Sequence, residues 1–281
     1  MFSWTCPPPS SSGEDPRTHW EKHARQPTIA IPPASPHPAC VDTQTLITLL
    51  LLSSGAGLSI FVGALLAKWC TRGGMEPNAM VQHSVLAFGG GALVSAVGLV
   101  LAPDGLGILP VWVAAALFVA GGAVFAVVDR VLHARGTPLS QVVATLLDFV
   151  PEAIVLGAVI VDAPAMAVAL AVLIAAQNLP EGFAAYLDIA RAGSGSALSR
   201  HPLAVLGACV VVGPLAALFG YYVCGQADPA LGVIMLFCAG GILLIVFRDI
   251  APRANLERSV LPSLAAVAGF AVGLVGLGVA H

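Results

Sequence analysis

The chain has 281 residues, of which 58% are hydrophobic and only 10% are charged. Soluble domains carry roughly 25% charged residues, so this composition excludes a water-soluble globular protein. The net charge is −3, and because the chain has no substantial basic patch, nucleic-acid binding has no support. We therefore expect an all-α polytopic protein of the lipid bilayer, with room for about eight spans of roughly 20 residues each.

The first 40 residues differ in composition from the rest of the chain. Residues 1–40 are rich in Pro and Ser and contain no basic segment followed by an apolar stretch and a cleavage site. We expect a disordered extracytoplasmic tail rather than a cleaved signal peptide. Cys6 and Cys40 could form a disulfide in an oxidising compartment, but the sequence fits two free thiols as well.

The remaining residues, 41–281, form the predicted membrane domain, with short connections between apolar segments. The eight predicted spans are 44–67, 81–101, 109–129, 140–161, 165–187, 203–223, 229–247 and 260–280. Glycine runs at 89–91, 121–122 and 240–241 favour close packing of transmembrane helices. The Pro-Asp-Gly sequence at 103–105 is expected to lie in the short connection after the second span.

The basic residues of the membrane domain all follow odd-numbered spans. They are Lys68, Arg72, Arg130, Arg135, Arg191, Arg200, Arg248, Arg253 and Arg258. The connections after spans two, four and six carry only Asp104, Asp162 and Asp228. By the positive-inside rule, this asymmetry predicts cytoplasmic odd-numbered connections and extracytoplasmic termini.

Three carboxylates lie deep inside predicted spans, where an ionisable residue costs roughly 2.5–3.5 kcal/mol on insertion scales. They belong to two matching segments, Asp-Phe-Val-Pro-Glu at 148–152 and Gln-Asn-Leu-Pro-Glu at 177–181. The spacing of four residues places the first and last member of each segment on one helix face. Each proline lacks an N–H and should leave the carbonyl four residues earlier without its helical donor. A single Pro-Glu would fit a helix-packing role, but its repetition in consecutive spans favours a cation site.

We therefore predict a divalent-metal site with oxygen ligands between spans four and five. The candidate ligands are Asp148, Glu152, Gln177, Asn178 and Glu181. Asn178 fits an interhelical hydrogen bond as well as a peripheral ligand role. Metal binding should release protons from the carboxylates, so transport should weaken at acid pH.

These motifs resemble those of the ZIP family of metal transporters, whose fourth and fifth spans carry His-Asn-x-Pro-Glu-Gly-like sequences at the transport site. Residues 148–153 and 177–182 match that pattern, and residues 88–91 and 240–252 are similar to parts of the family's second and seventh spans. The resemblance implies eight spans in a 3+2+3 arrangement with inverted repeats. It also implies transport of a divalent transition metal across the bacterial-type inner (plasma) membrane into the cytoplasm.

The resemblance favours zinc as the transported substrate, with Mn²⁺, Fe²⁺ and Cd²⁺ as alternatives. It implies no organic cofactor and no enzymatic activity, and it leaves room for a homodimer. Asp148 stands where the family usually has histidine, so we expect oxygen-only ligation. The family's second metal position corresponds to Phe149, Asn178 and Gly213, and because two of these offer no side-chain ligand we expect one metal.

Two other classes of function remain open. A protein with this fold could sense metal without robust transport. An intramembrane enzyme is the lesser alternative, because no Ser-His pair, HExxH motif or Arg cluster accompanies the deep acids.

Overall fold

The computed structural model describes residues 42–72, 77–135, 138–191, 200–224, 228–254 and 259–280. The predicted tail, including Cys6 and Cys40, lies outside them. Every regular element among the described residues is helical, and none is a strand. The elements are α2 (Thr43–Cys70), α3 (Ala79–Ala96), η1 (Val97–Leu101), α4 (Ala102–Ile108), α5 (Val111–Arg135), α6 (Pro138–Val159), α7 (Pro164–Arg191), α9 (Pro202–Val223), α10 (Pro229–Ile245), η2 (Val246–Ile250), α11 (Ala251–Ala254) and α12 (Leu261–Ala280), where η1 and η2 are π-helical turns.

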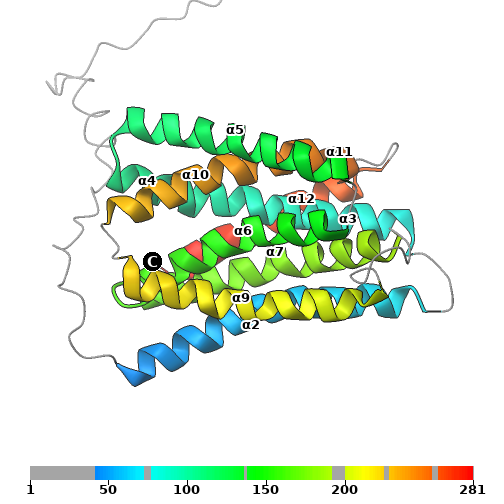
Figure 1. The fold of residues 1–281 in the computed structure, drawn as a ribbon, viewed down its shortest axis with the longest axis horizontal. Helices are drawn as coiled ribbons and strands as arrows, with labels where there is room; N and C mark the ends of the chain where they lie inside the picture. The colour runs from blue at the N-terminus through cyan, green and yellow to red at the C-terminus, as the bar shows by residue number, and fades with distance from the viewer. Residues whose placement is uncertain are drawn as a thin grey trace, which may run out of the picture. The chain divides into compact units, whose positions relative to one another are not determined.

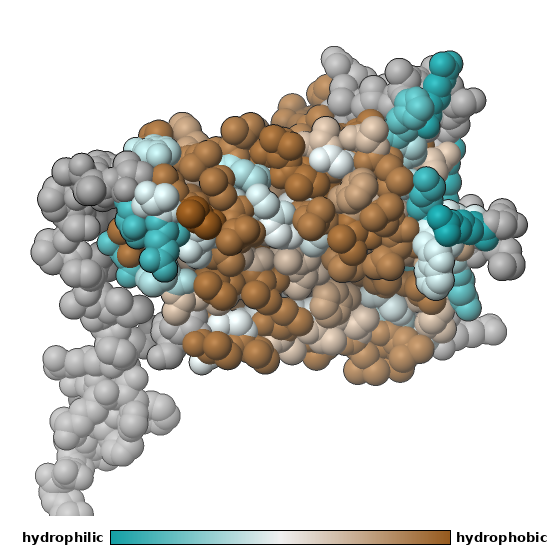
Figure 2. All heavy atoms as spheres, turned by 90° about the horizontal axis from the view of Figure 1, so that it is seen from below, coloured by the Kyte–Doolittle hydropathy of each residue, from teal (hydrophilic) through white to brown (hydrophobic). Residues whose placement is uncertain are grey.

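Seven helical stretches are long and apolar enough to cross a membrane, and they identify a multi-pass membrane protein. They are α2, Ala79–Ile108, Val111–Val131 of α5, α7, α9, Pro229–Ala254 and Leu261–Val279 of α12. α6 is not among the seven. Figure 2 shows a broad apolar surface between two ends where hydrophilic side chains gather. A water-soluble protein rarely exposes so much apolar surface, whereas a membrane protein exposes such a surface to lipid.

The second span extends further than predicted. We expected residues 103–105 in the connection after this span, and this prediction is wrong, because α4 continues the helix to Ile108. The π-helical turn η1 shifts the hydrogen-bonding register just before α4, and Pro103 falls in the first turn of the new helix. A missing N–H is tolerated there. η2 interrupts the seventh span in the corresponding way, between α10 and α11.

Four helix pairs approach closely through reciprocal glycines. Between α2 and α7, a Cβ on Gly63 would collide with the carbonyl oxygen of Leu179, and one on Gly182 with that of Ile60. The same reciprocity holds for Gly157 and Gly220 between α6 and α9, Gly91 and Gly269 between α3 and α12, and Gly121 and Gly240 between α5 and α10. Small residues allow such close backbone approach. The predicted packing role is therefore confirmed for at least one glycine in each of the three runs.

The two ends of the helical bundle differ in charge, and α4 and α11 lie at opposite ends in Figure 1. We call the end where α2, α5, α7 and α11 finish the basic end. Its described basic residues include Lys68, Arg72, Arg130, Arg191, Arg248 and Arg253. At the other end, Asp42 and Asp228 cap α2 and α10. Hydrogen bonds from the Thr45 hydroxyl and the Gln44 backbone hold the pKa of Asp42 below its ordinary value.

Candidate functional site

The five predicted ligands lie on two helices that pack against each other. α6 carries Asp148 and Glu152, and α7 carries Gln177, Asn178 and Glu181. Pro151 lies inside α6 and Pro180 inside α7, as predicted. Since a proline has no N–H, the carbonyls of Leu147 and Ala176 each lose a helical donor beside these side chains.

Most of these polar side chains are buried. Asp148 is 4% exposed, and Glu152, Gln177 and Asn178 are 0% exposed. Glu181 is half-buried as a residue, but both of its carboxylate oxygens are shielded from solvent. Such burial is expensive for polar groups and requires compensating partners.

One hydrogen bond joins the two motifs directly. The Gln177 side-chain nitrogen (Nε2) donates to Oε2 of Glu152, which connects α7 to α6. Asn178 points elsewhere, because its Nδ2 donates to the backbone oxygen of Ala56 in α2 over 3.1 Å. The structure thus brings Glu152 and Gln177 together and ties Asn178 to a third helix.

Six buried side-chain oxygens of these residues accept no hydrogen bond. They are Asp148 Oδ1, Glu152 Oε1, Gln177 Oε1, Asn178 Oδ1, and both Oε1 and Oε2 of Glu181. A buried acceptor without a partner costs about 1–3 kcal/mol, and more when it is charged. Native proteins leave few such groups, so their concentration on two adjacent helical segments needs an explanation.

The carboxylates of this site also lack a basic partner. No described Lys, Arg or His forms an ion pair with Asp148, Glu152 or Glu181. The negative charges of Asp148 and Glu152 act on Glu181, and those of Glu152 and of Asp249 in η2 act on Asp148. Mutual repulsion of buried charges is unfavourable unless a cation or protons neutralise them.

The three carboxylates do not form a closed coordination shell in this structure. Among the described residues, no three His, Cys, Asp or Glu side chains are grouped closely enough to hold a metal ion. The Gln177 amide occupies one oxygen of Glu152 instead. Ion binding would require side chains of α6 and α7 to move toward one another.

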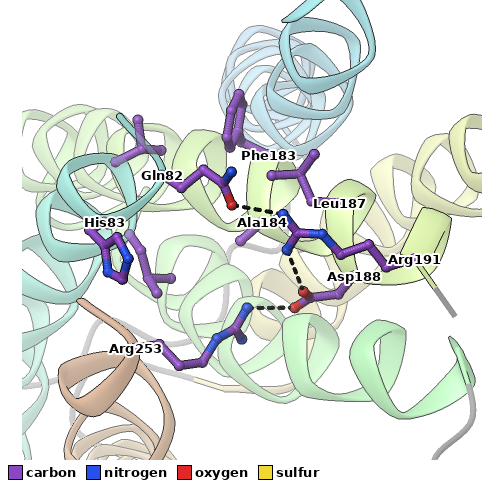
Figure 3. A pocket seen from close by; sticks show the side chains of 10 residues that line it. Gln82, His83, Phe183, Ala184, Leu187, Asp188, Arg191 and Arg253 are labelled. Atoms are coloured by element: carbon purple, nitrogen blue, oxygen red, sulfur yellow. Dashed lines mark hydrogen bonds and ion pairs between the residues drawn. The ribbon is translucent and has the colours of Figure 1, made fainter. Parts of the chain in front are cut away.

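A pocket of about 280 Å³ opens at the basic end of α7. Its lining includes Gln82 and His83 from α3, Ala184 and Asp188 from α7, and Arg253 from α11 (Figure 3). Ala184 lies one turn after Glu181 on α7. The pocket therefore approaches the candidate ligands from the basic end.

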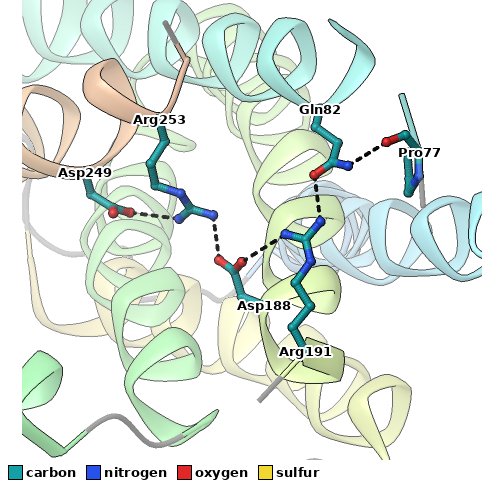
Figure 4. Close-up of polar contacts among 6 residues, drawn as sticks. All are labelled: Pro77, Gln82, Asp188, Arg191, Asp249 and Arg253. Carbon is teal, nitrogen blue, oxygen red and sulfur yellow. Dashed lines mark hydrogen bonds and ion pairs between the residues drawn. The ribbon is translucent and has the colours of Figure 1, made fainter. Parts of the chain in front are cut away.

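Ion pairs and hydrogen bonds connect polar residues that line this pocket, and Figure 4 shows these contacts. The guanidinium of Arg253 lies 2.8 Å from the carboxylate of Asp188 and 3.4 Å from that of Asp249. Arg253 thereby connects α11 with α7 and η2. Arg191 donates to Gln82 Oε1 over 2.9 Å, with Asp188 3.9 Å away. These half-exposed pairs are worth about 0–1 kcal/mol each, so they can open at little energetic expense.

This pocket and its polar network were not predicted from the sequence. Asp188 and Asp249 lie near the ends of predicted spans, and both pair with Arg253. The spacing of seven residues between Glu181 and Asp188, two helical turns, was the available signal for a shared helix face. The partners Gln82 and Arg253 come from distant segments, and no local pattern identifies them.

No protein-family model and no curated protein matches this chain. Its function must therefore be argued from its own residues.

Proposed function

We propose that this chain is a carrier of divalent metal cations, with Asp148, Glu152, Gln177 and Glu181 as the transport site. The observation that carries the proposal is the set of buried oxygens without hydrogen-bond donors on these residues. A divalent cation would supply the missing partner for these oxygens and neutralise most of the carboxylate charge. Asn178 remains outside the inner ligand set, since its amide is bonded to α2.

Gln177 would switch between two roles. Without a cation, its Nε2 donates to Glu152. Rotation of the side-chain amide, which exchanges the positions of Nε2 and Oε1, would present Oε1 to an incoming ion. Oε1 has no hydrogen-bond partner in the structure. Gln177 thus stabilises Glu152 in the metal-free protein and becomes a neutral ligand when the ion arrives.

The donor chemistry suits several divalent metals. Zinc is the preferred substrate by resemblance to the ZIP family, and oxygen-only ligation keeps Mn²⁺ and Fe²⁺ as close competitors, with Cd²⁺ as a further one. The metal is the transported substrate and not a resident cofactor. Carboxylates must be deprotonated to bind it, so each binding event releases protons.

The proposed architecture has eight spans in a 3+2+3 arrangement. α6, the fourth in chain order, is added to the seven apolar helices. With 22 residues, α6 is about 33 Å long, which suffices to cross a bilayer. The contacts between these helices are symmetric under one exchange, in which α2 is replaced by α9, α3 by α10, α5 by α12 and α6 by α7, and vice versa. Each pair of these helices that is in contact then becomes a pair that is also in contact. The same exchange maps η1 onto η2, which supports inverted repeats around a central site.

We propose that the ion leaves through the pocket at the basic end, which the positive-inside rule assigns to the cytoplasm. A single cysteine at Ala184, in a chain whose six native cysteines are replaced, should react with an impermeant thiol reagent added from that side. Mn²⁺ should slow the reaction. A cysteine at the adjacent Ala185, which is 0% exposed, should stay unreactive. Equal reactivity at both positions would contradict this route.

Acid should oppose transport. Lowering the pH on the loading side from about 7.5 to about 5.5 should reduce the initial rate of uptake, because protons compete with the metal for the same carboxylates. Initial rates in proteoliposomes at fixed free-metal concentration test this. A rate that rises on acidification would indicate proton-driven uptake without such competition.

The proposed function is tested by uptake of Zn²⁺, Mn²⁺, Fe²⁺, Cd²⁺ and Mg²⁺ into proteoliposomes that contain the full chain. We expect saturable uptake of transition metals above the level of protein-free vesicles. Tight binding without flux would favour a metal sensor. Neither binding nor flux for any of these ions would contradict the proposal.

A further inference from the structure

Phe149 is fully buried next to the candidate ligand Asp148, and it is the largest such side chain among the described residues. Its ring leaves α6 and reaches two other helices. A Cβ on Gly57 of α2 would lie 3.2 Å from Cζ of the ring, and one on Gly213 of α9 would lie 2.9 Å from Cε1. The ring therefore packs directly on two glycine backbones, and any side chain at position 213 would collide with it.

The space that the ring fills is bordered by oxygen atoms. The carbonyl oxygen of Val210 lies 3.0 Å from the Cβ position of Gly57, and that of Ser53 lies 3.1 Å from the Cβ position of Gly213. Pro214 lies inside α9, so the Val210 carbonyl lacks the helical donor that position 214 would otherwise supply. Without the ring, these carbonyls would border an empty space between α2, α6 and α9.

Asn178 borders the same turn of α2. Its amide nitrogen donates to Ala56, the residue before Gly57, while its Oδ1 is buried and accepts no hydrogen bond. A second cation in the space of the ring would be bordered by the Val210 and Ser53 carbonyls, with Asn178 bonded to the residue that precedes Gly57. The aromatic ring occupies this space instead, and an apolar ring offers a metal no ligand.

We propose that Phe149 limits the transport site to one cation by filling the space between Gly57 and Gly213. Phe149 is a specificity-determining residue in this sense, and Asn178 serves as an interhelical donor rather than a ligand. The inference rests on the proposed function, because it concerns the number of ions at that same site.

The experiment counts Mn²⁺ ions bound per full-length chain at saturation, by equilibrium dialysis and elemental analysis. Ions that remain bound to a Glu152→Gln, Glu181→Gln variant are subtracted, since they lie elsewhere on the chain. We expect one ion in the unmodified protein. Phe149→Asn with Gly213→Asp roughly conserves volume and replaces the ring by polar ligands, so we expect two ions in this variant.

A matched control exists at the α5–α10 interface, which contains none of the candidate ligands. There, a Cβ on Gly241 would collide with the ring of Phe125. Phe125→Asn with Gly241→Asp introduces the same chemical groups, and we expect the count to stay at one. A second ion in this control would overturn the inference, because any added carboxylate would then suffice.

Other outcomes separate this inference from the proposed function. Two ions in the unmodified protein would overturn the role of Phe149 and leave the transport site intact. One ion in both the unmodified protein and the Phe149→Asn, Gly213→Asp variant would do the same. No ion above background in the unmodified protein would overturn the proposed function, and this inference with it.

A smaller change keeps the test valid if that variant does not fold. Gly213→Ala should press its Cβ against the ring and weaken Mn²⁺ affinity by about tenfold, as displaced supporting groups do at metal sites. Adding Phe149→Leu should restore the affinity. Unchanged affinity in Gly213→Ala would contradict the contact between the ring and the site.

Discussion

Replacing Glu152 and Glu181 together by glutamine is expected to reduce metal uptake to the level of protein-free vesicles. Both carboxylates are buried, lack hydrogen-bond donors on at least one oxygen and have no basic partner among the described residues. Loss of supporting residues around metal sites already costs about 10–100-fold in affinity, and loss of two direct ligands should cost more. Glutamine has nearly the same shape as glutamate, so packing should be preserved.

The control for this pair is Asp228→Asn, which also exchanges a carboxylate for an amide. Asp228 caps α10 at the end opposite the pocket, and asparagine caps helices equally well. Its uptake should match that of the unmodified protein. Unfolding temperatures in detergent should be at least as high in the Glu152→Gln, Glu181→Gln variant, because two buried charges are removed. Uptake that survives the double substitution would refute the transport-site assignment.

The second large effect concerns the fold. Gly63→Ala should destabilise the protein by about 1–3 kcal/mol or more, because its Cβ would overlap the backbone of α7. The overlap involves the carbonyl oxygen of Leu179 and the amide nitrogen of Phe183, which flank Glu181. Metal affinity should therefore fall together with the unfolding temperature.

Gly55 provides a matched control on the same helix. A Cβ there would meet no heavy atom within 4 Å, so Gly55→Ala should leave stability unchanged or raise it by up to about 1 kcal/mol through helix propensity. Thermal unfolding in detergent compares the two variants. Equal unfolding temperatures would contradict the close approach of α2 and α7.

The sequence was sufficient to predict the helical spans and the position of the polar motifs within them. Apolar length and the cost of intramembrane charge are local properties, so 140–161 and 165–187 predicted α6 and α7 closely. The prediction of a connection at 103–105 was wrong, because Pro and Gly indicate a helix end only from their local sequence. The register shift at η1, which lets Pro103 start a new helical turn, depends on packing in the span.

Contacts between distant segments could not be read from the sequence. The pattern at 177–181 suggested that Gln177 faces an ion, but it gave no sign that its amide donates to Glu152 in the metal-free protein. Likewise, the sequence indicated only that Phe149 offers no ligand at the ZIP family's second metal position. Its role as a filler between Gly57 and Gly213 required the positions of three helices at once.

The location of the bound ion tests the central claim most directly. Crystals of the full chain grown with Mn²⁺ should show one strong anomalous difference peak between α6 and α7, within coordination distance of Glu152 and Glu181 and of an oxygen of Gln177. A strong peak confined to the pocket near His83 and Asp188, with none at the two glutamates, would contradict the account.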